Sequence, residues 1–501
     1  MSRRELLAAL RSLAWERESF LLSEVLPRAG KKMGAGELRR TLEPHLGFLG
    51  LRGVADGGDL LVTRLPPANP SIPSRAMLDT NETFLHHPTL PRRLQGLIET
   101  FIWKKTGKNW NDPVVLERIR AAIREQKGEY WNQKGGRPIS YRAGYRVLAY
   151  LAYQFPVAFV QSLHLLHDLA KDGLLKERMR ILDIGTGPGT VPLAITDTWG
   201  RLSLGQVQIF ALEQETENLE AWRSLVQAFA AGNPDAQIAE PLQGDLMSFD
   251  PDALPGEMDL IVFANVLNEL RKLRAGEKAA LVGKVARVLA ADGTILITEP
   301  ADLENSVALR ILTGALEKEG LFLYAPCTFL WNTACRPDQC WTFREAPPVS
   351  PPRLMEALAS SKDGYRYWNT DIKFSYAFLR KDGRTKQEYR IPEVTNALRL
   401  SKLQGHLKRR VNVLVAKMSG DLGGGRGHLV FKVCDGTPQK PVFAVIPQHQ
   451  ATRTRALVEG QYGEIFFLEH ALVRFNHPRD AYNLFIDRST IVKTLGKRGF
   501  T

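Results

Sequence analysis

The sequence is poor in cysteine. Only four of its 501 residues are cysteines, too few to cross-link a chain of this length with structural disulfides. This scarcity argues against a disulfide-stabilised secreted protein. Three of the four, Cys327, Cys335 and Cys340, nevertheless lie within one short stretch, and Cys434 stands apart from them. Such clustering favours a shared metal or cluster site over cross-links.

Long apolar runs are missing as well. No stretch of about 18 apolar residues occurs, so no membrane-spanning helix is predicted. Glu5, Glu16 and Glu18 interrupt the N-terminal stretch, and no uninterrupted apolar segment leads to a cleavage site there. We therefore expect a cytoplasmic protein that has no contact with membranes. The oligomeric state is not indicated by the sequence.

Acidic residues are outnumbered by basic ones. There are 67 Lys and Arg against 54 Asp and Glu, which gives a net charge of +13. A charge of this sign favours anionic partners, nucleic acid first, although a merely solvated basic surface would give the same composition. Hydrophobic residues make up 44% of the chain, which is ordinary for a protein with packed cores.

Patterning divides the chain into several regions. Leucines at helical spacing, including Leu21 and Leu22 in a predicted second helix, and two strand-like runs around residues 56–59 predict a winged-helix-like domain, or alternatively a small helical cap, at the N-terminus. Prolines then mark a linker. The predicted domains are winged-helix-like 1–65, linker 66–75, helical 76–175, α/β 176–398 with a cysteine-rich insertion at 325–352, and barrel 399–501.

Two of these regions have a recognisable architecture. In residues 176–398, short apolar runs alternate with helices, which predicts a parallel sheet covered on both faces. In residues 399–501 we expect five strands, the last over residues 483–493, with a helix before the fourth. This is the order of an OB-like β-barrel, although another kind of barrel would fit. The predicted fold class is thus α/β, with an added β-barrel.

A glycine-rich turn opens the α/β region. Residues 180–190 read RILDIGTGPGT, in which a strand ends near Asp183 and the turn runs into a helix. Gly185, Gly187 and Gly189 would let a ligand approach the backbone, and the amides of the turn are expected to point at it. Dinucleotide-binding and S-adenosylmethionine-binding sites both use such turns.

Acidic residues after the next two strands separate these alternatives. Glu213 ends the second strand, where a carboxylate can accept both hydroxyls of a ribose, and Asp245 follows the third, where it can take an adenine amino group. This spacing favours S-adenosylmethionine over a nicotinamide cofactor and indicates a class I Rossmann-like methyltransferase domain. The predicted cofactor-binding residues are Asp183, Gly185, Gly187, Gly189, Glu213, Asp245, Leu246 and Asn265.

The chemistry of the reaction is not indicated. Asn265, Asn268 and Glu269 follow the fourth strand, where they would contact the methionine end of the cofactor or the substrate, or would cap the next helix. The signature of amino-group methylation of bases is missing there. Pro326-Cys327 is similar to the nucleophile of 5-methylcytosine enzymes, but it follows the fifth strand and lies beside two other cysteines. No catalytic residue is assigned.

The cysteines are the predicted metal ligands. Thiolates suit zinc or an iron–sulfur cluster. Zinc sites more often use paired C-x2-C motifs, whereas the irregular spacing of Cys327, Cys335 and Cys340 with the remote Cys434 favours a [4Fe-4S] cluster. Zinc and buried free thiols remain alternatives.

Two basic patches are candidate RNA contacts. Residues 399–432 carry eight Lys or Arg and one Asp, including Lys408, Arg409 and Arg410 just before a predicted barrel strand. Lys104 and Lys105 lie beside Trp103 and form a second basic and aromatic cluster. Either patch is also explained by a solvated surface.

Three features together resemble a known family. They are the helical lead-in at 141–156, the glycine turn, and Ala325-Pro326-Cys327 with its two following cysteines. This combination is similar to the methyltransferase-like assembly proteins of the mitochondrial small ribosomal subunit and their prokaryotic relatives, over about residues 90–435.

The resemblance implies binding to small-subunit rRNA and a [4Fe-4S] cluster on Cys327, Cys335, Cys340 and Cys434. We therefore expect an RNA-directed, S-adenosylmethionine-binding methyltransferase-like protein. The alternatives are a non-catalytic ribosome assembly factor and a methyltransferase for proteins or small molecules.

Overall fold

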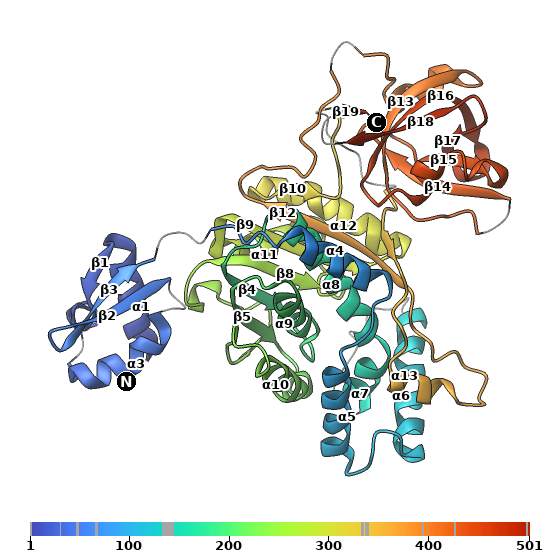
Figure 1. Ribbon diagram of the computed structural model, residues 1–501. Helices are drawn as coiled ribbons and strands as arrows, with labels where there is room; N and C mark the ends of the chain where they lie inside the picture. Colours follow the sequence, from blue (N-terminus) through green and yellow to red (C-terminus); the bar gives the residue numbers. More distant parts are fainter. Residues whose placement is uncertain are drawn as a thin grey trace.

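The computed structural model describes residues 3–30, 32–46, 50–65, 69–132, 145–331, 335, 340–392, 395–424, 427–496 and 499–500. A small N-terminal region, a group of helices, a central sheet and a β-barrel follow one another along the chain (Figure 1). None of the helices in these ranges is both long and apolar enough to cross a membrane.

The N-terminal region has the winged-helix order of elements. Leu6 and Leu10 of the first helix pack against Leu38 and Leu42 of the third in a core of their own. The short first strand pairs with the second strand of the hairpin, so that Phe20 lies opposite Val62. The elements are α1 (Arg3–Glu16), β1 (Ser19–Leu21), α2 (Val25–Arg28), α3 (Ala35–Leu46), β2 (Leu51–Asp56) and β3 (Asp59–Arg64).

One local prediction in this region was wrong. Leu21 and Leu22 were expected in a helix, but Leu21 ends β1 and Leu22 begins a short 3-10 turn. Pairing with β3 explains the difference, because it holds this segment extended up to Leu21.

A group of helices leads into the sheet. Asp112 begins the third of them, since its Oδ1 accepts a hydrogen bond from the Val114 amide at 2.8 Å. The proline-rich segment before them is attached to the end of the group, because the Ser71 amide donates to the Leu175 carbonyl at 2.8 Å. The helices are α4 (Arg75–His86), α5 (Arg92–Thr106), α6 (Pro113–Asn132), α7 (Tyr145–Tyr153) and α8 (Phe155–Lys171).

The central sheet has the order β10-β12-β9-β8-β4-β5-β6, with β11 and β7 at its margins. Its strands run parallel from β9 to β6, whereas β12 is antiparallel to β9. The strands are β4 (Arg178–Ile184), β5 (Gln206–Glu213), β6 (Ala236–Ile238), β7 (Leu242–Gln243), β8 (Met258–Ala264), β9 (Leu289–Pro300), β10 (Phe322–Ala325), β11 (Arg344–Ala346) and β12 (Ile372–Arg380).

Helices cover both faces of this sheet, as Figure 1 shows. Successive strand residues point to opposite faces, so Ile181 joins the core beneath α8 to α10 while Leu182 joins the core beneath α11 and α12. The strand order and the single antiparallel return make this a class I Rossmann-like methyltransferase fold, as predicted. Its helices are α9 (Thr190–Leu202), α10 (Thr216–Ala230), α11 (Ala275–Val285), α12 (Leu303–Leu316) and α13 (Arg353–Ala359).

The C-terminal strands close into a barrel of OB order. The pairings run β13-β14-β15-β17-β16 and return to β13, and the β15–β17 pairing is parallel. The elements are β13 (Arg410–Lys417), β14 (His428–Cys434), β15 (Val442–Pro447), α14 (Arg455–Glu459), β16 (Ile465–Asn476), β17 (Ala481–Phe485), β18 (Ile491–Gly496) and β19 (Gly499–Phe500). The single strand expected at 483–493 is thus two strands, because a turn at Asp487–Thr490 separates them.

A small core joins the barrel to the cysteine-rich segment. Leu330 and Trp331 pack against Leu414 and Phe467 of the barrel. The Trp331 indole donates to the buried Asp435 carboxylate at 2.8 Å, and the same oxygen accepts from the Leu400 amide at 2.9 Å. This satisfied polar group fixes where the barrel sits on the central domain.

Candidate functional site

A cavity of about 560 Å³ opens at the carboxyl ends of β4, β5 and β8. Strand β5 pairs with one edge of β4, and β8 pairs with its other edge. The strand order therefore reverses at β4. Open α/β sheets bind their ligands at such reversals. The volume suits a small-molecule cofactor.

The three glycines of the turn have three different surroundings. A Cβ on Gly185 would stand 2.7 Å from Val266, and one on Gly189 would stand 2.3 Å from Val226 of α10. A Cβ on Gly187 would meet nothing within 4 Å, because this residue faces the cavity. All three have φ between 56° and 96°, a conformation that favours glycine.

The turn amides are occupied within the protein, contrary to expectation. Gly185 and Thr186 donate to the Leu212 carbonyl at 2.8 and 3.1 Å, and Gly189 donates to the Thr186 carbonyl at 3.1 Å. The Gly187 amide donates to the Glu213 carboxylate at 2.8 Å. The prediction that these amides point at a ligand was therefore wrong, and the glycines instead provide space.

Two carboxylates lie at the centre of the cavity wall. Asp183 is completely buried, and its oxygens lie outside hydrogen-bonding geometry with every described residue, although the nearby Thr186 hydroxyl lowers its pKa somewhat. Burial raises its pKa to about 7. Glu213 accepts from the Gly187 and Glu215 amides, at 2.8 and 2.9 Å, while burial raises its pKa. An unpartnered buried carboxylate needs a ligand donor or a proton.

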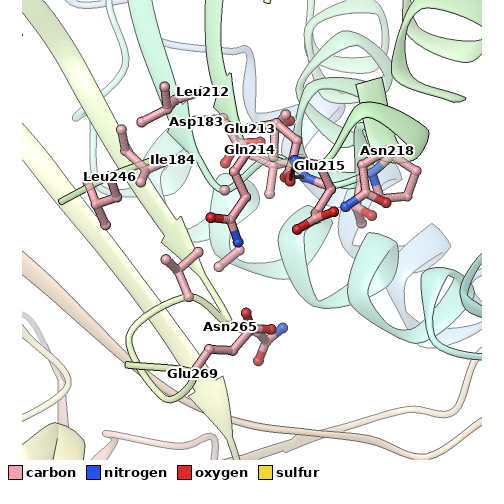
Figure 2. Close-up of a pocket in the computed structure, with 18 of the residues that line it drawn as sticks. Asp183, Ile184, Leu212, Glu213, Gln214, Glu215, Asn218, Leu246, Asn265 and Glu269 are labelled. Atoms are coloured by element: carbon pink, nitrogen blue, oxygen red, sulfur yellow. Dashed lines mark hydrogen bonds between the residues drawn. The ribbon is translucent and has the colours of Figure 1, made fainter. Parts of the chain in front are cut away.

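The remaining predicted cofactor residues flank this centre. Asp245, Leu246 and Asn265 line the cavity, together with Asp183, Gly185, Gly187 and Glu213. Gly189 does not line it and packs beneath α10 instead. Figure 2 shows how far apart these residues lie, with Leu246 on one side and Asn265 beside Glu269 on another. The structure thus gathers seven of the eight predicted residues around one space.

Several cavity residues were not predicted. Tyr150 of α7 and Gln161 and Ser162 of α8 form part of the wall, and the Tyr150 hydroxyl is 3.2 Å from the Thr190 hydroxyl. Their helical lead-in was noticed only as a family feature. Nothing in its apolar pattern shows which residues face a cavity formed by strands that follow later in the chain.

The four cysteines converge from three segments. Cys327 follows β10, Cys335 and Cys340 lie in the next loop, and Cys434 ends β14 of the barrel. Burial raises the pKa of Cys327, Cys335 and Cys434. The nearby Cys340 thiol raises the pKa of each of these three cysteines further. The four thiols are therefore near enough to influence one another's charge, and their role as ligands stays a prediction.

Two cations accompany these thiols. The guanidinium of Arg310 is buried beside Cys327, and the Lys432 ammonium lies 3.8 Å from the Cys340 sulfur. Among the described residues, no three His, Cys, Asp or Glu side chains are close enough together to hold a single metal ion. The site therefore combines four separated thiols with positive charge.

The predicted RNA contacts differ in their availability. Lys104, Lys408 and Arg409 are exposed. Lys105 instead forms an ion pair with Glu220, and Arg410 pairs with Asp487 at 2.7 Å. Figure 1 places α5, which carries Lys104, far from the barrel. These residues therefore do not form one surface.

A groove on the barrel adds residues that the sequence did not single out. It has a volume of about 500 Å³ and lies between Lys408 and the end of β16. Arg474 and His477 supply further positive or polar groups, and Phe475 supplies an aromatic ring. The pairing of β13 with β16 brings these residues next to Lys408, which is distant in sequence. The groove is lined by Leu407, Lys408, Leu472, Arg474, Phe475 and His477.

Comparison with known families assigns the chain to one of them. Residues 144–417, more than half of the chain, match the family model described as mitochondrial small ribosomal subunit Rsm22. The chain belongs to this family. The matched residues include the cofactor cavity and three of the four cysteines. A second model, described as the C-terminal domain of a domain of unknown function (DUF8157), matches residues 401–495 and includes Cys434 and the groove.

Solved structures similar to this chain are methyltransferases. An O-methyltransferase family protein from Burkholderia thailandensis is 13% identical and aligns over 63% of this chain and 89% of its own, with a TM-score of 0.30. Human N-acetylserotonin methyltransferase is 16% identical over 76% and 93%, with a TM-score of 0.25. Magnesium protoporphyrin IX methyltransferase from Synechocystis PCC 6803 is 9% identical over 53% and 98%, with a TM-score of 0.28. No curated protein sequence matches this chain.

The family match and the fold both indicate a methyltransferase-like protein. The Rsm22 family model spans the class I sheet from α7 to the first barrel strand. The protein is therefore a methyltransferase-like member of this family. Cys434 lies outside the part that this family model matches, and the groove lies partly outside it, because Lys408 is within the matched residues whereas Arg474 and Phe475 are not.

Proposed function

We propose that this protein binds S-adenosylmethionine in the cavity and acts on the RNA of the small ribosomal subunit. The observation that carries the proposal is the gathering of Asp183, Glu213, Asp245, Gly185 and Gly187 around one space at the reversal of the sheet. The family description, which names the small ribosomal subunit, supports the choice of partner. The net charge of +13 supports an RNA partner as well.

The cavity fits the cofactor by its chemistry. When bound, S-adenosylmethionine supplies a methyl group on a positively charged sulfur. The buried Asp183 carboxylate has no partner among the described residues and suits a cationic or donor group. Glu213 and Asp245 suit the ribose hydroxyls and the adenine amino group. At Gly187 the wall leaves open space that any side chain would fill.

Methyl transfer to purified small subunits tests the proposal. Subunits from cells that lack the protein are incubated with labelled S-adenosylmethionine and either the wild type or Gly187→Asp. The variant places a carboxylate in the cavity next to Glu213, so we expect it to lose cofactor binding. Label on rRNA that the variant does not transfer supports an RNA methyltransferase. Tight subunit binding without label supports a non-catalytic assembly factor, and label on protein alone supports a protein methyltransferase.

We further propose that the four cysteines hold a [4Fe-4S] cluster. One metal ion draws its ligands within a few ångströms of each other, whereas each thiolate of a cluster binds its own iron and stands farther apart. Four thiols that influence one another's charge, with the irregular spacing of the first three and one remote partner, support the second case. Arg310 and Lys432 suit the negative charge of a thiolate-bound cluster.

Iron, sulfide and zinc analysis of anaerobically purified protein tests the cluster. We expect iron and sulfide in the wild type, and less of both in Cys434→Ser. Zinc, or no metal at all, in the wild type would overturn this part of the proposal. Retention of the full iron content by Cys434→Ser would remove Cys434 from the ligand set.

A further inference from the structure

One carboxylate in the cavity has no function in the proposal so far. Glu269 follows β8 and lines the cavity, where its side chain remains exposed. Among the described residues, no hydrogen bond or ion pair holds its carboxylate, unlike that of Glu213. A polar group that is open to a cavity and unpaired in the protein is available to a ligand.

The order of strands shows which part of a ligand Glu269 would meet. Asp245 follows β7, which pairs with β5, and Glu213 ends β5 itself. The glycine turn follows β4, and Glu269 lies beyond it, after β8. If the adenine and ribose are held at Asp245 and Glu213, the sulfur end of the cofactor extends toward β8. Figure 2 shows Glu269 beside Asn265, across the cavity from Leu212.

The segment that carries Glu269 is held in place at three points. The Asn265 amide donates to the Thr298 carbonyl at 2.9 Å, and the Asn268 amide donates to the Glu299 carboxylate at 3.2 Å. The Lys278 ammonium donates to the Leu267 carbonyl at 2.6 Å. Asn265 itself adopts φ of 56°, which turns the chain sharply after β8. Glu269 is thus presented by a fixed loop rather than by a mobile one.

The surroundings of Glu269 favour proton exchange near neutral pH. Although the end of the Glu269 side chain is open to the cavity, desolvation by the surrounding cavity wall and the nearby Glu213 carboxylate raise the pKa of Glu269 to about 7. Glu299 at the end of β9 and Tyr150 on α7 also interact with it. Asp183 lines the same cavity and titrates in the same range, so only the part of a pH dependence that Glu269→Gln removes belongs to Glu269. Groups with a pKa close to the working pH are the most effective general bases.

We propose that Glu269 is the general base of the transfer reaction and that the methyl acceptor is a nitrogen or oxygen atom that carries a hydrogen. This inference rests on the proposed binding of S-adenosylmethionine. The acceptor's lone pair forms the new bond to the methyl carbon, and the carbon–sulfur bond breaks with its electrons remaining on sulfur. The proton of the acceptor passes to the Glu269 carboxylate, so charge and atoms balance.

The position of the cysteines supports a nitrogen or oxygen acceptor. Methylation at carbon 5 of a pyrimidine needs a thiolate nucleophile, and no cysteine is among the described residues that line the cavity. Cys327, which follows a proline as such nucleophiles do, lies instead with the other three cysteines. A carboxylate without a thiol suits removal of a proton from an amine, amide or hydroxyl.

Comparison of Glu269→Gln with Glu304→Gln tests the inference without requiring turnover. Glu304 is exposed on α12 and does not line the cavity. Calorimetry between pH 5.5 and 8.5 measures the affinities for sinefungin, which carries a charged amine in place of the methyl group, and for S-adenosylhomocysteine. We expect the wild type and Glu304→Gln to prefer sinefungin increasingly above pH 7, where Glu269 is ionised, and Glu269→Gln to lose about tenfold of this preference.

The outcomes separate the two proposals. If neither compound binds the wild type, the proposed function and this inference both fail. If both bind and Glu269→Gln keeps the pH-dependent preference, cofactor binding stands and the role of Glu269 is overturned. With small subunits as substrate, we expect Glu269→Gln to lower kcat by about 100-fold and to leave KM for the cofactor little changed.

Discussion

At the scale of residues, the three glycines of the turn have different physical functions. Gly185 makes room for Val266, Gly187 faces the cavity, and Gly189 makes room for Val226 on α10. The motif correctly indicated where the cavity lies. It did not show that Glu213 and the Leu212 carbonyl occupy the turn amides, because those bonds join residues about 26 positions apart.

Replacement of Gly185 by Ala separates backbone strain from close contact. Gly107 at the end of α5 is the matched control, because its φ of 68° is similar and nothing lies near its Cβ. Both substitutions cost about 1–2 kcal/mol in unfolding free energy from the left-handed backbone. We expect Gly185→Ala to cost about 1–3 kcal/mol more, because it also displaces Val266. Denaturant unfolding measures both, and equal losses would contradict the steric role.

The buried Asp183 carboxyl makes the stability of the ligand-free protein depend on pH. Its pKa rises from the model-peptide value of 3.8 to about 7 on folding. The folded state therefore retains a proton that the unfolded state releases, and stability is lost as pH rises from about 4 to 7. We expect Asp183→Asn to lose less stability than the wild type between pH 5 and pH 8.

Urea unfolding of the wild type, Asp183→Asn and the exposed control Asp235→Asn at several pH values measures this difference. Each unit of pKa shift corresponds to about 1.4 kcal/mol. The difference in unfolding free energy between the wild type and Asp183→Asn should therefore change by about 2–4 kcal/mol across the range. Parallel pH profiles for the wild type and Asp183→Asn would show that Asp183 does not titrate there.

At the scale of elements, periodicity predicted most strands of the sheet and the barrel. It located β4, β5 and β8 because these buried runs are continuous and end at glycine or polar residues. Periodicity failed where strand pairing or an ion pair determines the local structure. The segment around Leu21 has helical spacing but extends along β3, and Asp487 turns the chain inside an apolar stretch because its carboxylate pairs with Arg410.

An ion pair between elements distant in sequence contributes to the stability of the sheet edge. Arg344 on β11 contacts Asp168 on α8 at 2.7 Å, and both side chains are largely buried. We expect Arg344→Met to lower the unfolding free energy by about 3 kcal/mol, because Asp168 then stays charged without its main partner. This is the lower end of the usual range, since Lys386 also acts on Asp168.

The double variant Arg344→Met, Asp168→Asn provides the control. It removes the stranded charge, so thermal or urea unfolding should show recovery of part of the loss. If the double variant is less stable than Arg344→Met by the full cost of a second independent substitution, the pair does not interact energetically.

At the scale of the whole molecule, the sequence indicated candidate functional side chains but not the residues that they contact in the fold. The convergence of Cys434 with three distant cysteines was predicted from the resemblance. The groove was not, because Lys408 and Phe475 meet only through the β13–β16 pairing. Lys105 and Arg410 were assigned to RNA from charge alone, which cannot show that Glu220 and Asp487 neutralise them.

The proposed RNA binding should depend on salt through Lys408, which lines the barrel groove, and its exposed neighbour Arg409. Each lost phosphate contact lowers the slope of log affinity against log salt by about 0.7 for single strands. We expect Lys408→Ala, Arg409→Ala to lower the slope by about 1.4. Lys318→Ala, an exposed residue in the turn after α12 that does not line the groove, serves as a control for net charge. Fluorescence anisotropy with small-subunit rRNA fragments measures the slopes, and equal slopes would place the RNA elsewhere.

The Asp435 contact has a consequence for how such a protein would choose its target. By accepting from both Trp331 of the cysteine-rich segment and Leu400 at the start of the barrel segment, one Asp435 oxygen connects the domain with the cavity to the barrel with the groove. An RNA anchored at the groove presents to the cavity only those atoms that its own fold places at the distance between the two. Selection would then follow the three-dimensional shape of the RNA, so a site with the right sequence in an unfolded strand would go unrecognised.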